Sequence, residues 1–213
     1  MVIVRDRRGE KRFALQWGGM PEPAPIHEHA LSNLRYIREA MERASAFTSI
    51  PGWGGVVIGL TAVIAAFLAH DTATRSQWLR IWLAEAVVAA VIAAVTMVRK
   101  ARLAHVSFSG APARRFFISY FAPIVAGAAL TVFLARAGFH EALPATWLLL
   151  YGASFVSSGA YSIPLVPVMG VCFMLLGIIT GFVSFPVAAA LLGAGFGGLH
   201  ILFGVLIARR YGG

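Results

Sequence analysis

The sequence contains few charged residues, very few acidic ones and a single cysteine. Charged residues make up 13% of its 213 positions, against about a quarter in soluble domains. A fold held together by disulfides is excluded, because Cys172 has no second cysteine with which to pair. The hydrophobic share of 59% and the mean hydropathy of +0.77 instead indicate a membrane protein with several spans.

Charge is absent from most of the C-terminal third, because no Asp, Glu, Lys or Arg occurs between Ala142 and Ala208. A helical span needs about 20 mostly apolar residues, so this stretch accommodates three passes. Three further apolar runs precede it. We therefore predict an all-α polytopic membrane protein with six transmembrane helices in residues 50–208. The predicted spans are 50–69, 78–98, 116–135, 144–160, 164–183 and 186–208.

Several prolines stand where these helices are expected to begin. Proline is tolerated in the first turn of a helix, because the amide that it lacks has no partner there in any case. The prolines interpreted as helix starts are Pro51, Pro144, Pro164 and Pro186.

The basic residues predict which way the spans are oriented. Eight Lys or Arg precede Ile50, five lie between Arg99 and Arg115, and two form the pair Arg209 and Arg210. The opposite face would carry only Arg75, Arg80 and Arg136. The positive-inside rule then places the arm 1–49 and the tail 209–213 in the cytoplasm, with the chain in the cell membrane. Anionic lipid headgroups at the inner face, and not nucleic acid, are the expected partners of this charge.

The N-terminal arm is expected to be structured. Residues 1–20 predict a short hairpin that turns at Arg8–Gly9. Residues 28–50 predict an amphipathic cytoplasmic helix with one apolar stripe, formed by Leu34, Ile37, Met41 and Ala44. Such a helix could lie on the inner leaflet, cap the bundle, bind a cytoplasmic protein or pair with a second copy of the chain. Residues 28–60 resemble a segment of small multi-spanning bacterial membrane proteins of unassigned function, a resemblance that implies no activity.

The stretch Leu191–His200, LLGAGFGGLH, matches the pattern G-x-G-x-x-G of dinucleotide-binding loops. That fingerprint requires a preceding strand, a helix that opens at the glycines and an acidic residue about twenty positions later. Here the glycines lie inside an apolar run, and the chain ends at Gly213. We therefore expect neither a nucleotide nor any other cofactor at this stretch.

Close helix packing explains these glycines better. Gly193, Gly197, His200 and Gly204 follow at spacings of four, three and four, which places them on one face of a helix. Small residues allow transmembrane backbones to approach each other closely. The glycines expected at helix contacts are Gly55, Gly59, Gly193, Gly197 and Gly204.

Two ionisable residues, Glu85 and His200, fall firmly inside predicted spans and are candidates for a functional site because such residues are costly in lipid. The alternative is that a nearby hydroxyl, a backbone carbonyl or water satisfies each of them. Four hydroxyl-bearing residues share a helical face and could line a hydrated cavity, or bond across helices and back to their own backbone. These residues are Tyr151, Ser154, Ser158 and Tyr161. No metal site is expected, since the histidines lack ligand spacing.

The sequence also offers an enzymatic alternative. Gly152, Ala153 and Ser154 in the fourth span and His200 in the sixth resemble the serine and histidine of rhomboid intramembrane proteases. Phe155, however, stands where that family's motif has a glycine. The leading hypothesis is a non-enzymatic accessory subunit or a sensor that couples the membrane to a cytoplasmic partner. The main alternative is a small transporter or proton-coupled channel that uses Glu85 and His200, and an intramembrane serine hydrolase is the remote one.

Overall fold

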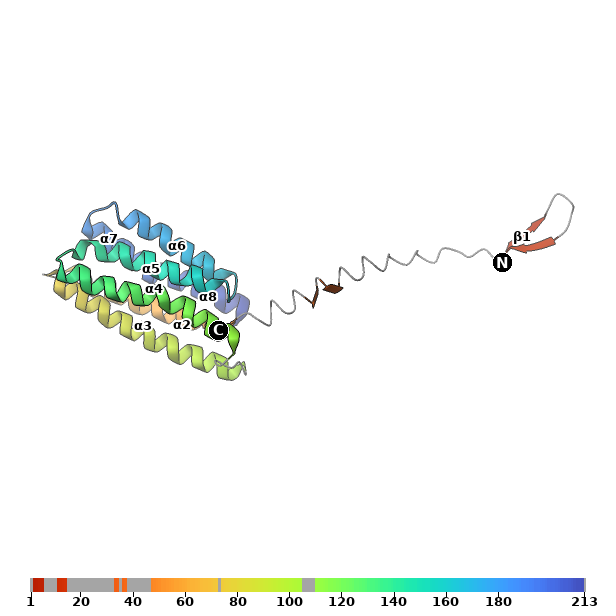
Figure 1. The fold of residues 1–213 in the computed structure, drawn as a ribbon, viewed down its shortest axis with the longest axis horizontal. Coiled ribbons are helices and arrows are strands. Elements are labelled where there is room, and N and C mark those ends of the chain that lie inside the picture. Colours follow the sequence, from red (N-terminus) through yellow and green to blue (C-terminus); the bar gives the residue numbers. More distant parts are fainter. Residues whose placement is uncertain are drawn as a thin grey trace. The chain divides into compact units, whose positions relative to one another are not determined.

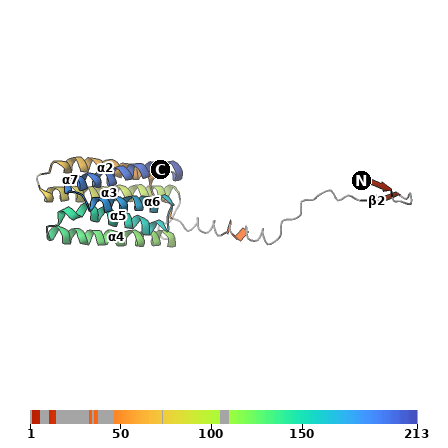
Figure 2. The ribbon, with the colours of Figure 1, turned by 90° about the horizontal axis from the view of Figure 1, so that it is seen from above.

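The structure is a computed structural model that describes residues 2–5, 11–14, 33–34, 36–37, 47–72, 74–104 and 110–212. The chain forms two compact units, Met1–Ala44 and Ser45–Gly213. In the second unit the helices run side by side along a common direction, as Figures 1 and 2 show.

The first unit contains an antiparallel hairpin made of strands β1 (Val2–Arg5) and β2 (Lys11–Ala14). The predicted hairpin is confirmed, and its turn at Arg8–Gly9 lies outside the described residues. Residues 33–34 and 36–37 are helical, within the segment predicted to form the amphipathic helix. The rest of that segment up to residue 46, including Met41 and Ala44, lies outside the described residues.

The predicted helix does not extend to Ile50, because Phe47–Ile50 are not helical. Phe47 instead forms a parallel bridge with Ser162. Ile50 precedes a proline, and steric contact with the proline ring disfavours helical backbone at that position. We call Phe47–Ile50 the strap.

The second unit is helical between its turns. Its helices are α2 (Gly52–His70), α3 (Arg75–Leu103), α4 (Ala111–Arg136), α5 (Leu143–Gly159), α6 (Leu165–Thr180), α7 (Phe185–Gly193) and α8 (His200–Tyr211). A short 3₁₀ turn, η1 (His140–Ala142), precedes α5, and a π-helical segment, η2 (Ala194–Leu199), joins α7 to α8. The residues Phe185–Tyr211 therefore form one continuous helical rod.

Four helices of this unit are long and apolar enough to cross a membrane: α2, α3, α4 and the rod Phe185–Tyr211. Helix α6 is also apolar but has only 16 residues, which corresponds to about 24 Å and falls short of a hydrocarbon core of about 30 Å. It ends three residues before the predicted boundary, because Gly181–Ser184 form the turn into α7. The 17-residue α5 is similarly short.

The predicted helix starts are confirmed. Pro51 and Pro164 directly precede α2 and α6, and Pro144 and Pro186 lie in the first turns of α5 and α7. Helix α3 begins three residues before the predicted span, at Arg75, because a capping box starts it there, and it ends five residues after that span, at Leu103. In the capping box the Thr74 hydroxyl accepts from the Gln77 amide at 3.2 Å, and the Gln77 side chain accepts from the Thr74 amide at 3.3 Å.

The α2 helix and the rod are in direct backbone contact. A methyl group added at Gly59 would lie 2.7 Å from the carbonyl oxygen of Gly197, and one added at Gly204 would lie 2.7 Å from the Val56 amide. A methyl group added at Gly55 would lie 3.4 Å from the Cα of Gly204. In lipid, where hydrophobic burial gives little driving force between helices, such close packing supplies much of the association energy.

Helices α5 and α6 form a second contact of the same kind. A methyl group at Gly152 would lie 2.6 Å from the carbonyl oxygen of Gly170, and one at Gly170 would lie 2.6 Å from that of Gly152. At the last residue of α5, a methyl group added at Gly159 would lie 2.6 Å from Cδ of the Pro167 ring. The two short helices therefore form a tightly closed hairpin.

A proline inside α4 leaves one backbone carbonyl without its helical donor. Pro123 has no amide hydrogen, so the carbonyl of Ser119, four residues earlier, lacks the usual partner. The hydroxyl of Ser157 on α5 donates to that carbonyl at 2.8 Å. A side chain of a neighbouring helix thus satisfies the group and joins α4 to α5.

Two matched glycine substitutions test the α2 contact. We expect Gly59→Ala to lower the free energy of unfolding by about 1–3 kcal/mol, because the added methyl group overpacks a backbone contact. Gly198→Ala should be neutral or stabilising by up to about 1 kcal/mol, since nothing lies within 4 Å of its added methyl group and alanine favours a helix. The measurement is denaturant-induced unfolding in detergent micelles. Equal effects of the two substitutions would contradict the packing role.

Candidate functional site

The glycine-rich stretch Leu191–His200 lies within a continuous helical rod, so it does not form a phosphate-binding loop. Its residues Ala194–Leu199 adopt a π-helix, a local widening that is often found at functional sites. Gly197 contacts Val63 of α2. A methyl group added at Gly193 would lie 2.8 Å from the Cβ of Ala66, also on α2. The glycines therefore bring the π segment against α2.

The buried side chain of His200, at the end of the π segment, has a partner on each ring nitrogen. Nδ1 lies 2.8 Å from the carbonyl oxygen of Phe196, and Nε2 lies 2.8 Å from the hydroxyl of Tyr151. A carbonyl oxygen can only accept, so Nδ1 carries the hydrogen. In the neutral ring, Nε2 then accepts the hydroxyl hydrogen of Tyr151. The two contacts fix both the tautomer and the orientation of the ring.

Tyr120 on α4 packs against this pair, with its ring edge-on to that of Tyr151 at a centroid distance of 6.5 Å. The hydrogen bond from Tyr151 to His200 itself joins α5 to α8. We call Tyr151 and His200 the polar chain.

Aromatic rings surround the polar chain. The ring of Tyr151 meets Phe155 and Phe173 edge-on at centroid distances of 4.9 and 5.1 Å, and Phe196 stacks on His200 at 6.0 Å. This apolar shell holds the polar groups in one geometry. A proton could pass along the chain only if Tyr151 switched from donating to accepting when His200 gained a second hydrogen.

Glu85 belongs to a different part of the bundle. Its Oε1 accepts from the hydroxyl of Thr61 on α2 at 2.8 Å, and that hydroxyl also lies 2.9 Å from the carbonyl oxygen of Ile58. Glu85 and His200 each have partners of their own, and the described residues contain no hydrogen bond between the two. The sequence left open that a nearby hydroxyl or carbonyl satisfies the polar atoms of Glu85 and His200. Both environments agree with that alternative.

The four residues of the predicted hydroxyl stripe do not share one site. Only Tyr151 enters the polar chain. Ser154 donates back to the carbonyl oxygen of Tyr151 in its own helix at 2.6 Å. The buried hydroxyl of Ser158 has no hydrogen-bond partner, and the backbone carbonyl of Tyr161, at the turn after α5, accepts from the Phe47 amide at 2.7 Å.

The geometry of a serine hydrolase is not formed. Ser154 is hydrogen-bonded to its own helix, and Nε2 of His200 is occupied by Tyr151. A nucleophile and its base need to lie within hydrogen-bonding distance of each other, and the described residues contain no such contact between this serine and this histidine. They also contain no cluster of three or more His, Cys, Asp or Glu that could hold a metal ion.

Comparison with known protein families, characterised proteins and solved structures found no match. The functional interpretation therefore rests on the geometry of this chain.

The strap is a second feature, which the sequence did not reveal. The Phe47 ring is buried against Phe116 of α4 at a centroid distance of 4.9 Å. The hydroxyl of Ser162, in the turn between α5 and α6, donates to the carbonyl oxygen of Phe47 at 2.8 Å. The strap is thus fixed both to α4 and to the turn after α5. A phenylalanine followed by small polar residues carries no signal by which such a role could be recognised.

Lys100 near the end of α3 holds the other end of the strap. Its Nζ donates to the carbonyl oxygens of Ile50 at 2.9 Å, Tyr211 at 3.2 Å and Gly212 at 2.6 Å. Three ammonium hydrogens therefore meet three carbonyl oxygens. The strap, the end of α3 and the end of α8 are held together at this one cation.

Two indole groups are buried in the bundle without a hydrogen bond. Nε1 of Trp78 and Nε1 of Trp82 have no hydrogen-bond partner, although both side chains are almost fully buried. Trp78 stacks on Trp147 at 5.5 Å, and Trp82 packs against Phe196 at 6.1 Å. Nothing in the sequence indicates that these N–H groups would lack acceptors.

The polar chain predicts a stability effect that is specific to Tyr151. Tyr151→Phe leaves Nε2 of the buried His200 without its donor, and we expect a loss of about 1–3 kcal/mol in the free energy of unfolding. Tyr161→Phe removes the same atom from a tyrosine whose hydroxyl makes no hydrogen bond among the described residues, and should change stability little. Unfolding in detergent measures both. A Tyr151→Phe variant as stable as Tyr161→Phe would rule out the hydrogen bond as a stabilising element.

Proposed function

We propose that the chain is an integral protein of the cell membrane that acts as a non-enzymatic accessory subunit or sensor, coupling its membrane helices to a cytoplasmic partner. In this proposal the bundle makes six passes, with α5 and α6 as a short hairpin held by its neighbours. Both ends of the chain lie in the cytoplasm. The observation that carries the proposal is the strap, through which the first unit is covalently joined to the bundle.

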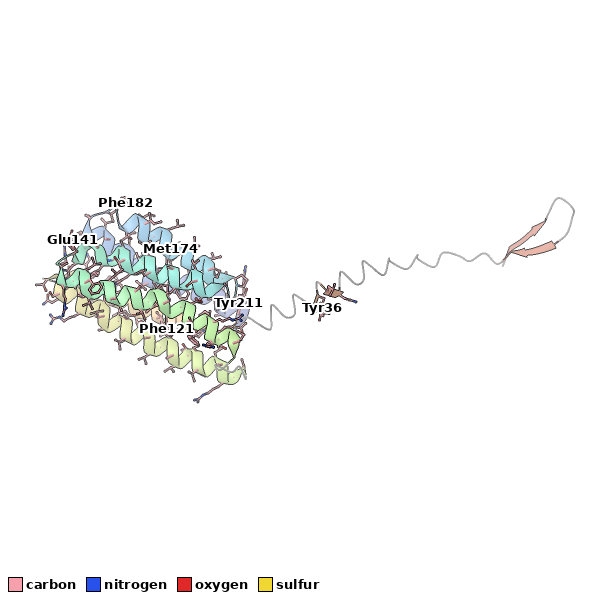
Figure 3. All side chains as sticks on the ribbon, in the orientation of Figure 1. Tyr36, Phe121, Glu141, Met174, Phe182 and Tyr211 are labelled. Carbon is pink, nitrogen blue, oxygen red and sulfur yellow. The ribbon has the colours of Figure 1, made fainter. Side chains whose placement is uncertain are left out.

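The distribution of charge at the two ends of the bundle supports this orientation. Tyr211 lies at one end, and Glu141 and Phe182 lie at the other (Figure 3). The end that includes Tyr211 carries seven basic residues: Arg99, Lys100, Arg102, Arg114, Arg115, Arg209 and Arg210. The opposite end has Arg75 ion-paired with Glu141 at 3.5 Å and placed over the Phe185 ring at 3.6 Å. The positive-inside rule favours the cytoplasm for the first of these ends.

The fixed attachment of the strap supports a coupling role. A freely hanging arm would need no contacts at its root, whereas the strap is held by α4, by the turn after α5 and by Lys100. A change in the arrangement of these helices would therefore alter the segment that leads to the first unit. Conversely, a partner that pulls on the first unit would act on three parts of the bundle at once.

The first unit offers an apolar surface that suits a protein partner. Leu34, Tyr36 and Ile37 lie in helical backbone, and each exposes at least half of its surface. Leu34 and Ile37 belong to the predicted apolar stripe, which has the spacing of helices that bind in grooves. The inner leaflet and a second copy of the chain are the competing occupants of this surface.

A photocrosslinker at Ile37 of the full-length chain, expressed in its native host, tests the proposal. We expect one discrete adduct with a different protein, because the accessory role requires a stable partner at this surface. The same crosslinker at Phe182, which is exposed at the opposite end of the bundle, serves as the control and should not give that adduct. The measurement is mass spectrometry of the purified adducts. Adducts with lipid alone would refute the proposal that a protein partner binds this surface.

A small transporter or proton-coupled channel is the second candidate, and the polar chain is the observation that favours it. Here a proton would use His200 and Tyr151, with Glu85 contributing from the α2–α3 interface. Proteoliposomes containing the purified chain would then show proton flux that disappears in His200→Ala or Glu85→Gln. His140→Ala, a change in η1 away from the polar chain, is the matched control. An unchanged background leak in all variants would eliminate this candidate.

A further inference from the structure

The Lys100 contact is unusual because all its partners are neutral. Nζ donates to the carbonyl oxygens of Ile50, Tyr211 and Gly212 and to no carboxylate among the described residues. The contacts to Tyr211 and Gly212 are exposed, and the one to Ile50 is half-buried. A positively charged group thus holds two chain segments together while it remains accessible from outside.

Among the described residues, Lys100 has basic neighbours and no acidic partner. Arg99 and Arg102 flank it on α3, and Arg209 and Arg210 immediately precede the carbonyls that it binds; all four are exposed. The described part of the second unit contains three acidic residues, and none of them is at this end. Asp71 directly follows α2, Glu85 lies within α3, and Glu141 is at the opposite end. Several like charges therefore converge where the strap and the C-terminus meet.

We propose that this cluster binds the phosphate group of an anionic phospholipid, and that phosphate binding at Lys100 releases the strap. This inference rests on the proposed function, because it requires the basic end to face the inner leaflet. A phosphate oxygen carries a formal charge, so it forms a stronger hydrogen bond with an ammonium group than a neutral carbonyl does. The neighbouring guanidinium groups can bind the same phosphate through paired N–H donors.

Release at Lys100 would loosen the strap at one end only. The contact to Ile50 would be lost together with those to the end of α8, since a single ammonium group makes all three. The Phe47 amide would still donate to Tyr161, and Ser162 would still donate to Phe47. Residues 48–50 would then be released between the retained anchor at Phe47 and the start of α2, and the lipid composition would govern the mobility of this part of the strap.

A nitroxide label on the strap tests the proposal in the full-length chain. Thr48 is exposed, so Thr48→Cys in a Cys172→Ala background gives a single labelling site there. The protein is reconstituted in vesicles of phosphatidylcholine alone, or of phosphatidylcholine with increasing phosphatidylglycerol. We expect the mobile fraction in the electron paramagnetic resonance spectrum to rise several-fold with phosphatidylglycerol, and this rise to weaken at high salt.

Two variants separate the effect of the Lys100 hydrogen bonds from that of the positive charge at this end of the bundle. Lys100→Met should show a high mobile fraction already in phosphatidylcholine, with no further response to phosphatidylglycerol. Arg102→Met, which removes a charge from the same end but no hydrogen bond to the strap, should have the low mobile fraction of the unmodified chain in phosphatidylcholine. The lipid titration of the unmodified chain needs no variant and remains decisive if Lys100→Met does not fold.

Several results would overturn the inference. A strap equally immobile in both lipids would exclude release by headgroups, and an immobile strap in Lys100→Met would exclude Lys100 as its anchor. Inorganic phosphate added to phosphatidylcholine vesicles separates the two sources of phosphate: release by the free ion at millimolar concentration would overturn the lipid as the ligand. If the Ile37 adduct persists while the strap ignores lipid, this inference alone fails. If the strap responds and no adduct forms, the proposed function fails instead.

Discussion

Backbone groups inside a bilayer must find their hydrogen bonds within the protein, because the hydrocarbon core offers no water. At three irregular positions of this bundle, two within it and one at its end, a side chain donates to a backbone carbonyl oxygen. Ser157 satisfies the carbonyl that Pro123 frees in α4. His200 satisfies Phe196 in the π segment. Lys100 satisfies carbonyls of the strap and of the C-terminus. Two of these donors, His200 and Lys100, also belong to the candidate sites.

This dual role links the two candidate sites to the same packing. The glycine contacts between α2 and the rod determine where the π segment lies, and the π segment determines where His200 meets Tyr151. The rod then continues to the C-terminus, whose carbonyls share Lys100 with the strap. The strap in turn is the covalent link to the first unit. A shift of the rod against α2 could therefore reach both the polar chain and the strap.

The helices could be predicted from the sequence because their causes are local: apolar runs, prolines at helix starts and glycines at helical spacing. The same periodicity singled out His200 and Tyr151, although it could not show that they pair. Contacts between distant segments were not predictable. Nothing around Phe47 indicates that it enters the bundle, and Lys100 reads as one more positive charge at a helix end. The contact between Gly152 and Gly170 was not predicted either, because it joins residues of two different helices.

The orientation of the bundle is the premise on which the proposed coupling and the lipid inference both depend. Labelling of single cysteines in a Cys172→Ala background measures this orientation most directly. The cells are treated with a membrane-impermeant thiol reagent before and after permeabilisation. Thr48→Cys and Tyr211→Cys probe the basic end, and Phe139→Cys and Phe182→Cys probe the opposite one. The account predicts that the first pair reacts only after permeabilisation and that the second pair reacts in intact cells. Reaction of Tyr211→Cys in intact cells would contradict it.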